Sequence, residues 1–464
     1  MCHVQAARNS GCFISELPMR PLIFAAALLA ATPAFAQQEF PATLAGHALL
    51  PANTMLTPPA DAPADLQTSG KFLAPMGRVD QVGTVMGRSA GRPTGLSTPF
   101  RGQPVQGHSG IRRMADGTYW VLTDNGFGSK ANSPDSMLYL NRYRIDFDKG
   151  TFERLETIFL SDPDKKVPFR IANEGTERRY LTGSDFDTES FQIIGGKIWI
   201  GDELGPFLIR VDMTGKVEAV FETMVDGQVV RSPDHPAVTT PALPSTPVQF
   251  RVRRSKGFEG MAASPDGRFL YPLLEGALVD AAGTGLEMVD GKQYLRILEF
   301  DVQAGRYTGR HWKYVLDENG LSIGDFNMID ATTGLIIERD DNEGVAERAC
   351  PAGQRAETCF HALPRIKRIW KIEMTDANAG GAVRKIGFID LLKIRDPNNR
   401  SRVPLSGGNF QFPFFTIENV DVVDADHIIV GNDNNLPFSS SRDPNKADDN
   451  EMVLLRVPEF LRAR

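Results

Sequence analysis

Long apolar runs are almost absent from this chain of 464 residues. Residues 21–36 form the one apolar run of note, and nothing later approaches the roughly 18 to 20 residues that a membrane-spanning helix needs. The run ends in Ala34-Phe35-Ala36, the small-x-small pattern that signal peptidase cleaves. We therefore predict a signal peptide over residues 1–36, with translation starting at Met1 or at Met19, and a periplasmic or secreted protein without a membrane span.

Cysteine and histidine are also scarce, with 4 and 7 residues. Cleavage after Ala36 would remove two of the cysteines and leave Cys350 and Cys359 in an oxidising compartment. We expect these two to form a disulfide. His361 lies nearby in the sequence, but a zinc site needs about four ligands and no second cluster adjoins it.

Basic charge is in deficit, since the formal net charge is −7. Nucleic acids and anionic membrane surfaces require a basic face, so neither is an expected partner. A small anionic substrate would need local positive charge, and residues 251–256 supply a basic string, with Arg251, Arg253, Arg254 and Lys256 as candidate substrate-binding residues. The alternative is that this string is a solvated part of the proline-rich loop over residues 226–256.

Helical periodicity is hard to find, and short β-type runs separated by Gly, Asp, Asn and Pro dominate. One unit recurs five times: a small or acidic residue, an apolar stretch, a turn, and a strand that ends in an acidic or amide residue about 15 residues later. This spacing fits two antiparallel strands of one propeller blade. We predict an all-β protein, a β-propeller of about six or seven four-stranded blades.

Domain boundaries follow from composition. Residues 37–70 are rich in Pro, Ala, Thr and Asp and read as an extended linker, which leaves residues 71–464 for the propeller. The wide gap between the units at Asp325 and Glu418 suggests a further blade with outer strands at residues 365–374 and 384–392. The segment just after the linker is expected to complete the last blade beside residues 452–457.

The recurring units place acids at equivalent positions. In a propeller, the first strand of each blade lines the central channel, so these acids should converge at one end of it. Many carboxylates together need a cation, and carboxylate and amide oxygens suit Ca²⁺ better than Zn²⁺. The candidate metal ligands are Asp124, Glu189, Glu259, Glu338, Glu418 and Asp433.

A separate motif, Gly87-Arg88-Ser89-Ala90-Gly91, has the G-x-S-x-G form of a serine nucleophile elbow. That elbow joins a strand to a helix, whereas here the motif is followed by Arg92-Pro93-Thr94-Gly95, which reads as a loop. The sequence therefore disfavours a serine hydrolase.

Several stretches resemble the phytase-like family, described by its esterase-like activity. They are Gly107–Ile111 (GHSGI), Val121–Gly126 (VLTDNG), Gly201–Pro206 (GDELGP), the run GFEGMAASPDG from Gly257, and Ile336–Asp341 (IIERDD). The resemblance implies an exported propeller and metal-dependent hydrolysis of phosphoesters. The chain departs from the family pattern at Ser190 and Asn419, where glycine is usual beside the retained glutamates.

We therefore expect a monomeric, Ca²⁺-dependent hydrolase of a small anionic or ester substrate. Glu259, Glu275, Asp202 and Glu203 are the expected catalytic residues. Two alternatives remain open: a Ca²⁺-dependent lactonase or arylesterase, and a non-catalytic exported binding propeller in which a metal only holds the blades together.

Overall fold

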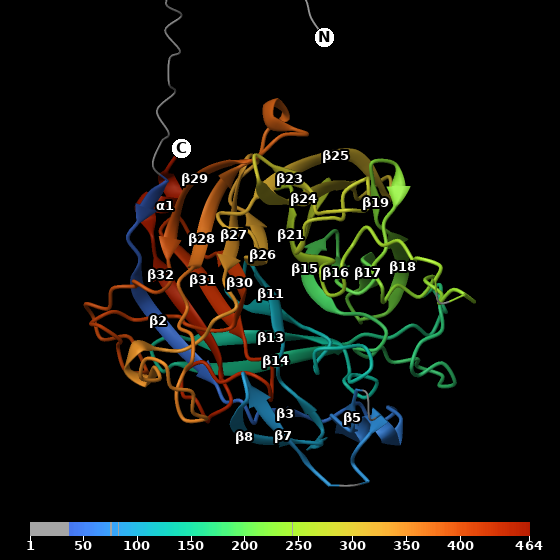
Figure 1. Cartoon of the computed structure of the whole chain (residues 1–464), viewed down its shortest axis with the longest axis horizontal. Coiled ribbons are helices and arrows are strands. Elements are labelled where there is room, and N and C mark those ends of the chain that lie inside the picture. Colours follow the sequence, from blue (N-terminus) through green and yellow to red (C-terminus); the bar gives the residue numbers. More distant parts are fainter. Residues whose placement is uncertain (1–36, 75–76, 82, 244) are drawn as a thin grey trace, which may run out of the picture. The chain divides into compact units, whose positions relative to one another are not determined.

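Five four-stranded antiparallel blades surround a central axis in the computed structural model, which describes residues 37–464 except 75–76, 82 and 244. The predicted signal peptide lies outside these residues. Figure 1 shows the innermost strands of the blades, β11, β15, β21, β26 and β30, gathered around the centre. Each inner strand packs against the inner strands of its two neighbours, and β30 packs against β11, so the ring is closed.

The first three blades follow one another along the chain. Their strands, from the axis outward, are β11 (His108–Arg113), β12 (Tyr119–Thr123), β13 (Tyr139–Asp146) and β14 (Thr151–Phe159); β15 (Thr188–Ile194), β16 (Lys197–Asp202), β17 (Phe207–Asp212) and β18 (Val217–Glu222); and β21 (Phe258–Ala263), β22 (Phe269–Leu274), β24 (Lys292–Asp301) and β25 (Arg306–Val315).

The fourth blade contains β26 (Ser322–Met328), β27 (Thr333–Arg339), β28 (Lys367–Glu373) and β29 (Arg384–Asp390), to which β1 (Gln38–Phe40) adds in parallel. The fifth contains β30 (Thr416–Val422), β31 (His427–Asp433), β32 (Asn450–Arg456) and β2 (Thr43–Leu50). The prediction of a propeller is confirmed, but the described chain has five blades rather than six or seven. The sequence assigned β28 and β29 to an additional blade, because long loops separate them from β27 and β30. In the structure β28 pairs with β27, and β29 pairs with β28, so the two strands complete the blade of β26.

An N-terminal strand closes the ring, as it often does in propellers, but it comes from within the segment predicted as a linker. β2 pairs antiparallel with β32, from Thr43 opposite Arg456 to Leu50 opposite Asn450. Leu44 and Ala48 are buried at alternating positions of β2, as in a blade strand. The Pro- and Ala-rich composition of the surrounding segment conceals this short alternation. The segment after residue 70 instead forms peripheral hairpins.

The core consists of layers between neighbouring blades. The faces of adjacent blades share continuous clusters of buried side chains: Trp120, Leu122, Phe191 and Ile200 between the first and second, Trp199, Phe258 and Phe300 between the second and third, and Leu273, Ile336 and Trp370 between the third and fourth. Ile337, Ile417 and Val430 join the fourth blade to the fifth, and Ile111, Val121 and Ile429 join the fifth to the first. Because both faces of each blade are covered, the strands read as apolar runs, and each buried side chain contributes about 1.5–3 kcal/mol of transfer free energy.

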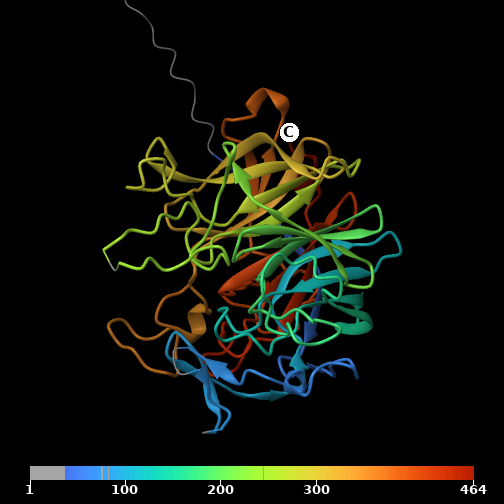
Figure 2. The same ribbon diagram turned by 90° about the vertical axis from the view of Figure 1, so that its right-hand side faces the viewer.

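Short strands and loops cover one end of the propeller, drawn in blue and orange at the bottom of Figure 2. The short strands are β3 (Met55–Leu56), β4 (Thr68–Ser69), β5 (Phe72–Leu73), β6 (Gly77–Arg78), β7 (Val85–Ser89), β8 (Arg92–Thr98), β9 (Phe100–Arg101) and β10 (Gln103–Pro104), with β19 (Met224–Val225), β20 (Gln228–Val229) and β23 (Met288–Val289) elsewhere. The α-helix α1 (Pro458–Arg462) follows β32, and short 3₁₀ turns lie at Ala64–Gln67, Ala346–Arg348 and Asp376–Asn378.

The predicted disulfide is confirmed, since Cys350 and Cys359 are bonded in the loop that follows β27. Among the described residues, no helix is long and apolar enough to cross a membrane.

Candidate functional site

Every inner strand is interrupted by a β-bulge at the same level of the channel. In three blades the extra, unpaired residue is a glutamate: Glu189 in β15, Glu259 in β21 and Glu418 in β30. A bulge re-aims the side chain of the extra residue, and here it gathers three carboxylates from three blades. Ser109 lies in the corresponding bulge of β11, and Gly324 with Asp325 in that of β26.

A second set of charged residues stands at the end of the second strand of each blade, as its last residue or the one directly after it. The register aligns His108 with Thr123, Thr188 with Asp202, Phe258 with Leu274, Ile323 with Glu338 and Ile417 with Asn432. The next residues along the chain are Asp124, Glu203, Glu275, Arg339 and Asp433. The propeller therefore repeats a two-level arrangement in which the fourth blade replaces both carboxylates, with Gly324 at the bulge and Arg339 at the strand end.

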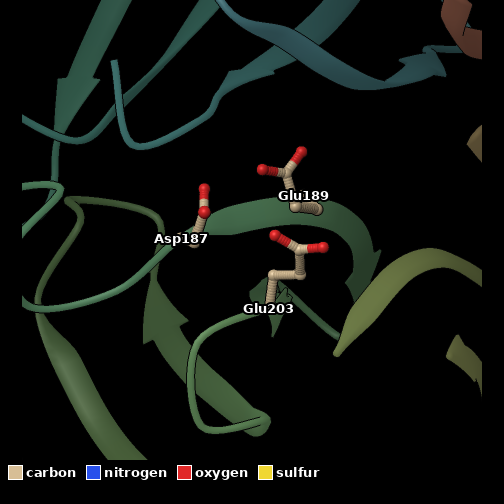
Figure 3. A group of neighbouring side chains, drawn as sticks. All are labelled: Asp187, Glu189 and Glu203. Atoms are coloured by element: carbon tan, nitrogen blue, oxygen red, sulfur yellow. The ribbon is translucent and has the colours of Figure 1, made fainter. Parts of the chain in front are cut away.

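These two levels, with Asp187, form a buried acidic centre of eight residues: Asp124, Asp187, Glu189, Glu203, Glu259, Glu275, Glu418 and Asp433. Ligand atoms lie within 4.8 Å of one another in three groups, namely Asp187–Glu189–Glu203, Glu189–Glu259–Glu418 and Glu203–Glu259–Glu275. Figure 3 shows the first group, with the carboxylates of Glu189 and Glu203 turned to the same side as that of Asp187. Glu189, Glu203 and Glu259 each belong to two groups, so the groups overlap pairwise.

Burial and mutual repulsion raise the pKa of most of these carboxyl groups. Burial, and then the neighbouring Asp187, raises the pKa of Asp124 to about 8. Burial also lifts the pKa of Glu189, Glu203 and Glu259 well above the ordinary value, and in each case another carboxylate of the centre adds to it. Such pKa values mean that the centre costs free energy when it is fully ionised and uncompensated.

Two side chains supply positive charge to this centre. Burial alone would raise the pKa of Glu275, but Lys256, which binds its Oε2, and Arg339 together hold that pKa below the usual range. The Nη2 atom of Arg339 lies 3.2 Å from Glu418 Oε1, and its Nη1 atom donates to Asp341 over 2.7 Å. Ser109 donates its hydroxyl to the other oxygen of Glu418 over 3.0 Å. Two cations against eight carboxylates leave a strong excess of negative charge.

The residues fit a hard metal cation. Their donors are carboxylate oxygens without a nearby thiolate, which is the chemistry that Ca²⁺ and Mg²⁺ prefer. Glu259 is 5% exposed, and its Oε1 atom has no hydrogen-bond partner among the described residues. A buried carboxylate oxygen left unpaired costs free energy that a cation would offset.

Not all predicted ligands and acids lie in this centre. Asp202 accepts backbone N–H donors from Asp187 and Gly205, at 2.8 and 2.7 Å, and so holds the turn that carries Glu203. Glu338 binds Lys385 Nζ at 2.7 Å and the hydroxyl of Tyr314, so it lies buried between the fourth blade and β25 of the third. The strand alternation sends Glu338 away from the axis.

The basic string divides in two. Arg251 and Arg254 turn to carboxylates of surrounding loops, Glu287 and Asp234. Lys256 reaches Glu275, and the exposed Arg253 lies beside Gly276, where a Cβ would stand 3.1 Å from its Nη2. Only half of the string therefore faces the acidic centre.

Sequence reasoning missed Arg339 and Asp187. Arg339 follows Glu338 directly in the sequence. Once the strand register is known, Arg339 aligns with Asp124, Glu203, Glu275 and Asp433. Asp187 lies just before β15, two residues before Glu189, and so falls outside the recurring unit that pointed to the other acids.

Fold and site together define a five-bladed β-propeller whose channel contains a buried cluster of carboxylates that could hold a metal ion. Residues 103–436 match the model of the Phytase-like family, described as esterase-like activity of phytase. The match covers well over half of the chain, so the chain belongs to this family, whose description is of a hydrolase type.

Individual relatives are more distant. An uncharacterized secreted protein of Arthroderma benhamiae is 27% identical over 299 residues, which are 51% of this chain and 57% of that protein. Among solved structures, the Pseudomonas aeruginosa periplasmic gluconolactonase is 14% identical, with 81% of this chain and 99% of that chain covered and a TM-score of 0.31. The calcium-binding protein regucalcin from Agrobacterium tumefaciens is 13% identical, with coverages of 75% and 91% and a TM-score of 0.33. At these TM-scores neither structure bears on the site.

Proposed function

We propose that the protein is an exported hydrolase of phosphoesters that depends on divalent cations, with Ca²⁺ as the expected ion, held by the acidic centre. The observation that carries the proposal is the pairwise overlap of the three carboxylate groups through Glu189, Glu203 and Glu259. A carboxylate shared by two groups suits two adjacent cations, the arrangement with which many enzymes stabilise an in-line displacement at phosphorus.

Charge makes the cation requirement strict. A phosphate monoester is an anion, and an uncompensated centre of eight carboxylates would repel it. Bound Ca²⁺ would supply the positive charge that attracts the ester and stabilises the charge that develops during hydrolysis. Glu189, Glu259 and Glu418 are the residues that we assign to cation binding, because each projects from a bulge of an inner strand.

The remaining groups of the centre would bind and move protons. Glu203 and Glu275 are adjacent to Glu259 and are the candidate bases that take a proton from the attacking water. Arg253 and Lys256, at the edge beside Gly276 and Glu275, would orient the phosphoryl oxygens. The bond between phosphorus and the leaving oxygen breaks, and the leaving alcohol receives a proton from a protonated carboxyl group.

An assay with and without EDTA tests the proposal. We expect release of inorganic phosphate from phenyl phosphate in Ca²⁺, loss of this activity in EDTA and recovery when Ca²⁺ is added back, while calorimetry records Ca²⁺ binding. A rise in melting temperature with Ca²⁺, but no turnover of any ester, would overturn the proposal in favour of a non-catalytic binding propeller.

A second candidate, a cation-dependent lactonase or arylesterase, is favoured by a specific observation. Arg251 and Arg254, expected to hold a phosphate, are engaged by Glu287 and Asp234 instead. An uncharged ester would not need them. Hydrolysis of phenyl acetate or a lactone without phosphate release from phenyl phosphate would select this candidate.

Export is part of the proposal, since the signal peptide lies outside the described residues. The disulfide between Cys350 and Cys359 fits an oxidising compartment, and the Arthroderma benhamiae relative is named as secreted. N-terminal sequencing of the mature protein should begin at Gln37.

A further inference from the structure

A side cavity of about 270 Å³ adjoins the acidic centre on the side of the fourth and fifth blades. We use the name side cavity for the space lined by Ser89, Asp341, Asn342, His361, Phe415 and Phe438, with the buried Glu343 and Arg92 at its base. Three segments far apart in the sequence form it: the β7–β8 hairpin, the loop after β27, and the stretches that flank β30 and β31.

The side cavity is connected to the acidic centre through Arg339. Asp341 in its wall accepts from Arg339, which in turn contacts Glu418, so two polar contacts connect cavity and carboxylates. The Arg339 guanidinium lies over the ring of Phe415 in the same wall, 5.9 Å from the centroid of that ring. Phe415 comes three residues before Glu418. A larger cavity of about 690 Å³, lined by Phe207, His235 and Tyr307 among others, has no described lining residue in polar contact with Arg339 or with the acidic centre.

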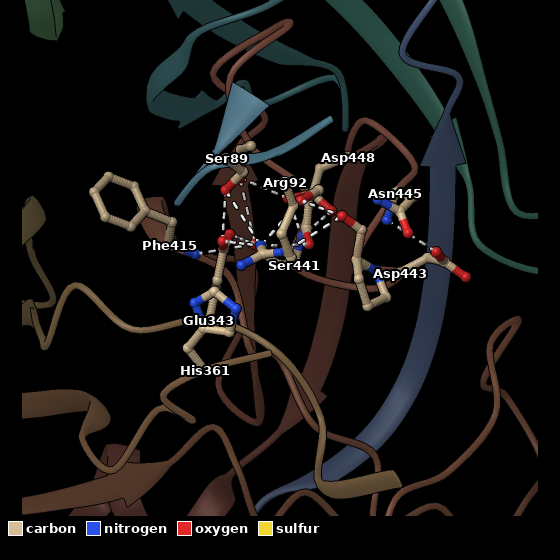
Figure 4. Close-up of polar contacts among 12 residues, drawn as sticks. Ser89, Arg92, Glu343, His361, Phe415, Ser441, Asp443, Asn445 and Asp448 are labelled. Carbon is tan, nitrogen blue, oxygen red and sulfur yellow. Dashed lines mark hydrogen bonds and ion pairs between the residues drawn. The ribbon is translucent and has the colours of Figure 1, made fainter. Parts of the chain in front are cut away.

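The base of the side cavity is fixed by a polar network (Figure 4). Glu343 accepts from Ser89 over 2.5 Å, from Arg92, and from Ser441 over 3.1 Å, so both of its oxygens are used. Arg92 is 1% exposed and also contacts Ser440, and its guanidinium lies over the ring of Phe360. Ser89, the residue of the G-x-S-x-G motif, is thus part of a scaffold that fastens the hairpin.

The disulfide supports the opposite wall. Cys350 donates its backbone N–H to Phe360, and Phe360 donates to Arg348, so the bonded loop holds Phe360 against Arg92 and Gly344. The next residue is His361, which lines the cavity. An ion pair of 3.0 Å between Arg88 and Glu357 joins this loop to the β7–β8 hairpin.

We propose that the side cavity receives the alcohol portion of the ester while its reacting group lies at the acidic centre, and that it selects a single uncharged ring. This inference rests on the proposed function. Phe415 is 37% exposed, which is high for a phenylalanine, and with Phe438 it offers apolar faces to a ring. The volume lies just below that of pockets for drug-sized ligands, which suits one six-membered ring.

Charge sets the selection against anions. Asp341 and Glu343 both line the cavity, and the acidic centre lies beyond Asp341. Arg92 and Arg339 are already paired with Glu343 and Asp341, so a second phosphate or a carboxylate on the ring would find no unpaired cation among the described lining residues and would face the acidic centre. Asn342 and His361 can bond to a hydroxyl of the ring without this penalty.

Filling the cavity tests the proposal. Ala362 is an exposed lining residue, so Ala362→Trp should fold normally and occupy the space, and Ala282→Trp in an exposed loop outside the lining is the matched control. With the Ca²⁺-loaded protein, we expect kcat/KM for phenyl phosphate to fall by at least about tenfold in Ala362→Trp, as expected when a pocket loses a ring contact. Methyl phosphate turnover and Ca²⁺ affinity should stay unchanged, and 4-carboxyphenyl phosphate should be a poorer substrate than phenyl phosphate for the unsubstituted protein.

A binding measurement separates this proposal from the proposed function. Saturation-transfer NMR should detect the ring protons of phenyl phosphate on the unsubstituted protein and on Ala282→Trp, and much less on Ala362→Trp. Ring binding lost in Ala362→Trp without any ester turnover would keep the cavity assignment and overturn the hydrolase. Equal turnover and equal ring binding in both tryptophan variants would overturn the cavity assignment and leave the hydrolase standing.

Discussion

Two levels of the same channel treat buried charge in opposite ways. A second polar network, here called the lower network, begins at Asp325 in the bulge of β26 and continues a few residues further along the inner strands, where it joins Asn327, Asp421, Arg112 and Gln192. Asp325 accepts from the backbone N–H groups of Phe326 and Val420, at 2.8 and 3.1 Å, and from the Asn327 amide at 3.0 Å. In the acidic centre, by contrast, carboxylates face carboxylates and Glu259 Oε1 has no partner among the described residues.

The difference distinguishes polar groups that stabilise the fold from polar groups that are suited to bind a ligand. The lower network surrounds its carboxyl groups with donors from the same and neighbouring blades and so ties the blades together, although burial still raises the pKa of Asp325 to about 7. The acidic centre is positioned by bulges and strand ends and lacks donors in the same number, which is the arrangement expected for a site that binds a cation. The three predictions below test this contrast.

The largest expected effect is on the pH dependence of stability without divalent cations. Asp124, with a pKa of about 8, and Glu189, Glu203 and Glu259, with strongly raised pKa values, bind protons more tightly in the folded than in the unfolded chain. The free energy of unfolding in EDTA should therefore fall as the pH rises from about 4 to about 8, by about 1.4 kcal/mol per pH unit for each group that titrates.

Urea unfolding between pH 5 and pH 8, in EDTA and in saturating Ca²⁺, measures this dependence. Under the proposed function Ca²⁺ would bind the ionised carboxylates, so it should flatten the curve, and its affinity should rise with pH. Equal pH profiles of stability in EDTA and in Ca²⁺ would mean that the acidic centre does not bind Ca²⁺ and, like the lower network, only stabilises the fold.

The next effect concerns Arg339, which stands where the other blades place a carboxylate. Arg339→Met should lower the free energy of unfolding in EDTA by about 3–5 kcal/mol, because Glu418 is left as an unpaired buried charge. Saturating Ca²⁺ should recover much of this loss. Arg112→Met in the lower network is the control, and the loss that it causes should be the same with and without Ca²⁺. Identical behaviour of the two variants would refute the distinction.

The smallest effect compares two amide substitutions that change little in shape. Glu259→Gln should weaken Ca²⁺ binding on the order of 100-fold in calorimetry, because a charged ligand oxygen becomes a neutral one. Asp325→Asn should leave Ca²⁺ affinity unchanged and lower stability, since it weakens the bonds to Phe326 and Val420. A similar change in affinity for both variants would show that the two levels are not distinct.

The repeated unit carried most of what could be predicted. Glu189, Glu259 and Glu418 lie together in the structure, as expected from an acid that recurs at the head of apolar strands, and their role as metal ligands stays a prediction. The partner residues were harder, since a single-residue shift in register sends a side chain to the other face of a strand. That shift separates Glu338, bound to Lys385 and Tyr314 between two blades, from Arg339 at the axis.

Sequence alone determined the fold class, the disulfide between Cys350 and Cys359, and the gathering of acids at one end of the channel, because these follow from local periodicity and residue chemistry. Tertiary structure decided the number of blades and the use of β2 to close the ring, since strand pairing across long loops is not written in local pattern. It also decided which carboxylates lie within 4.8 Å of one another and where the side cavity lies, because bulges and loops from distant segments set those positions together.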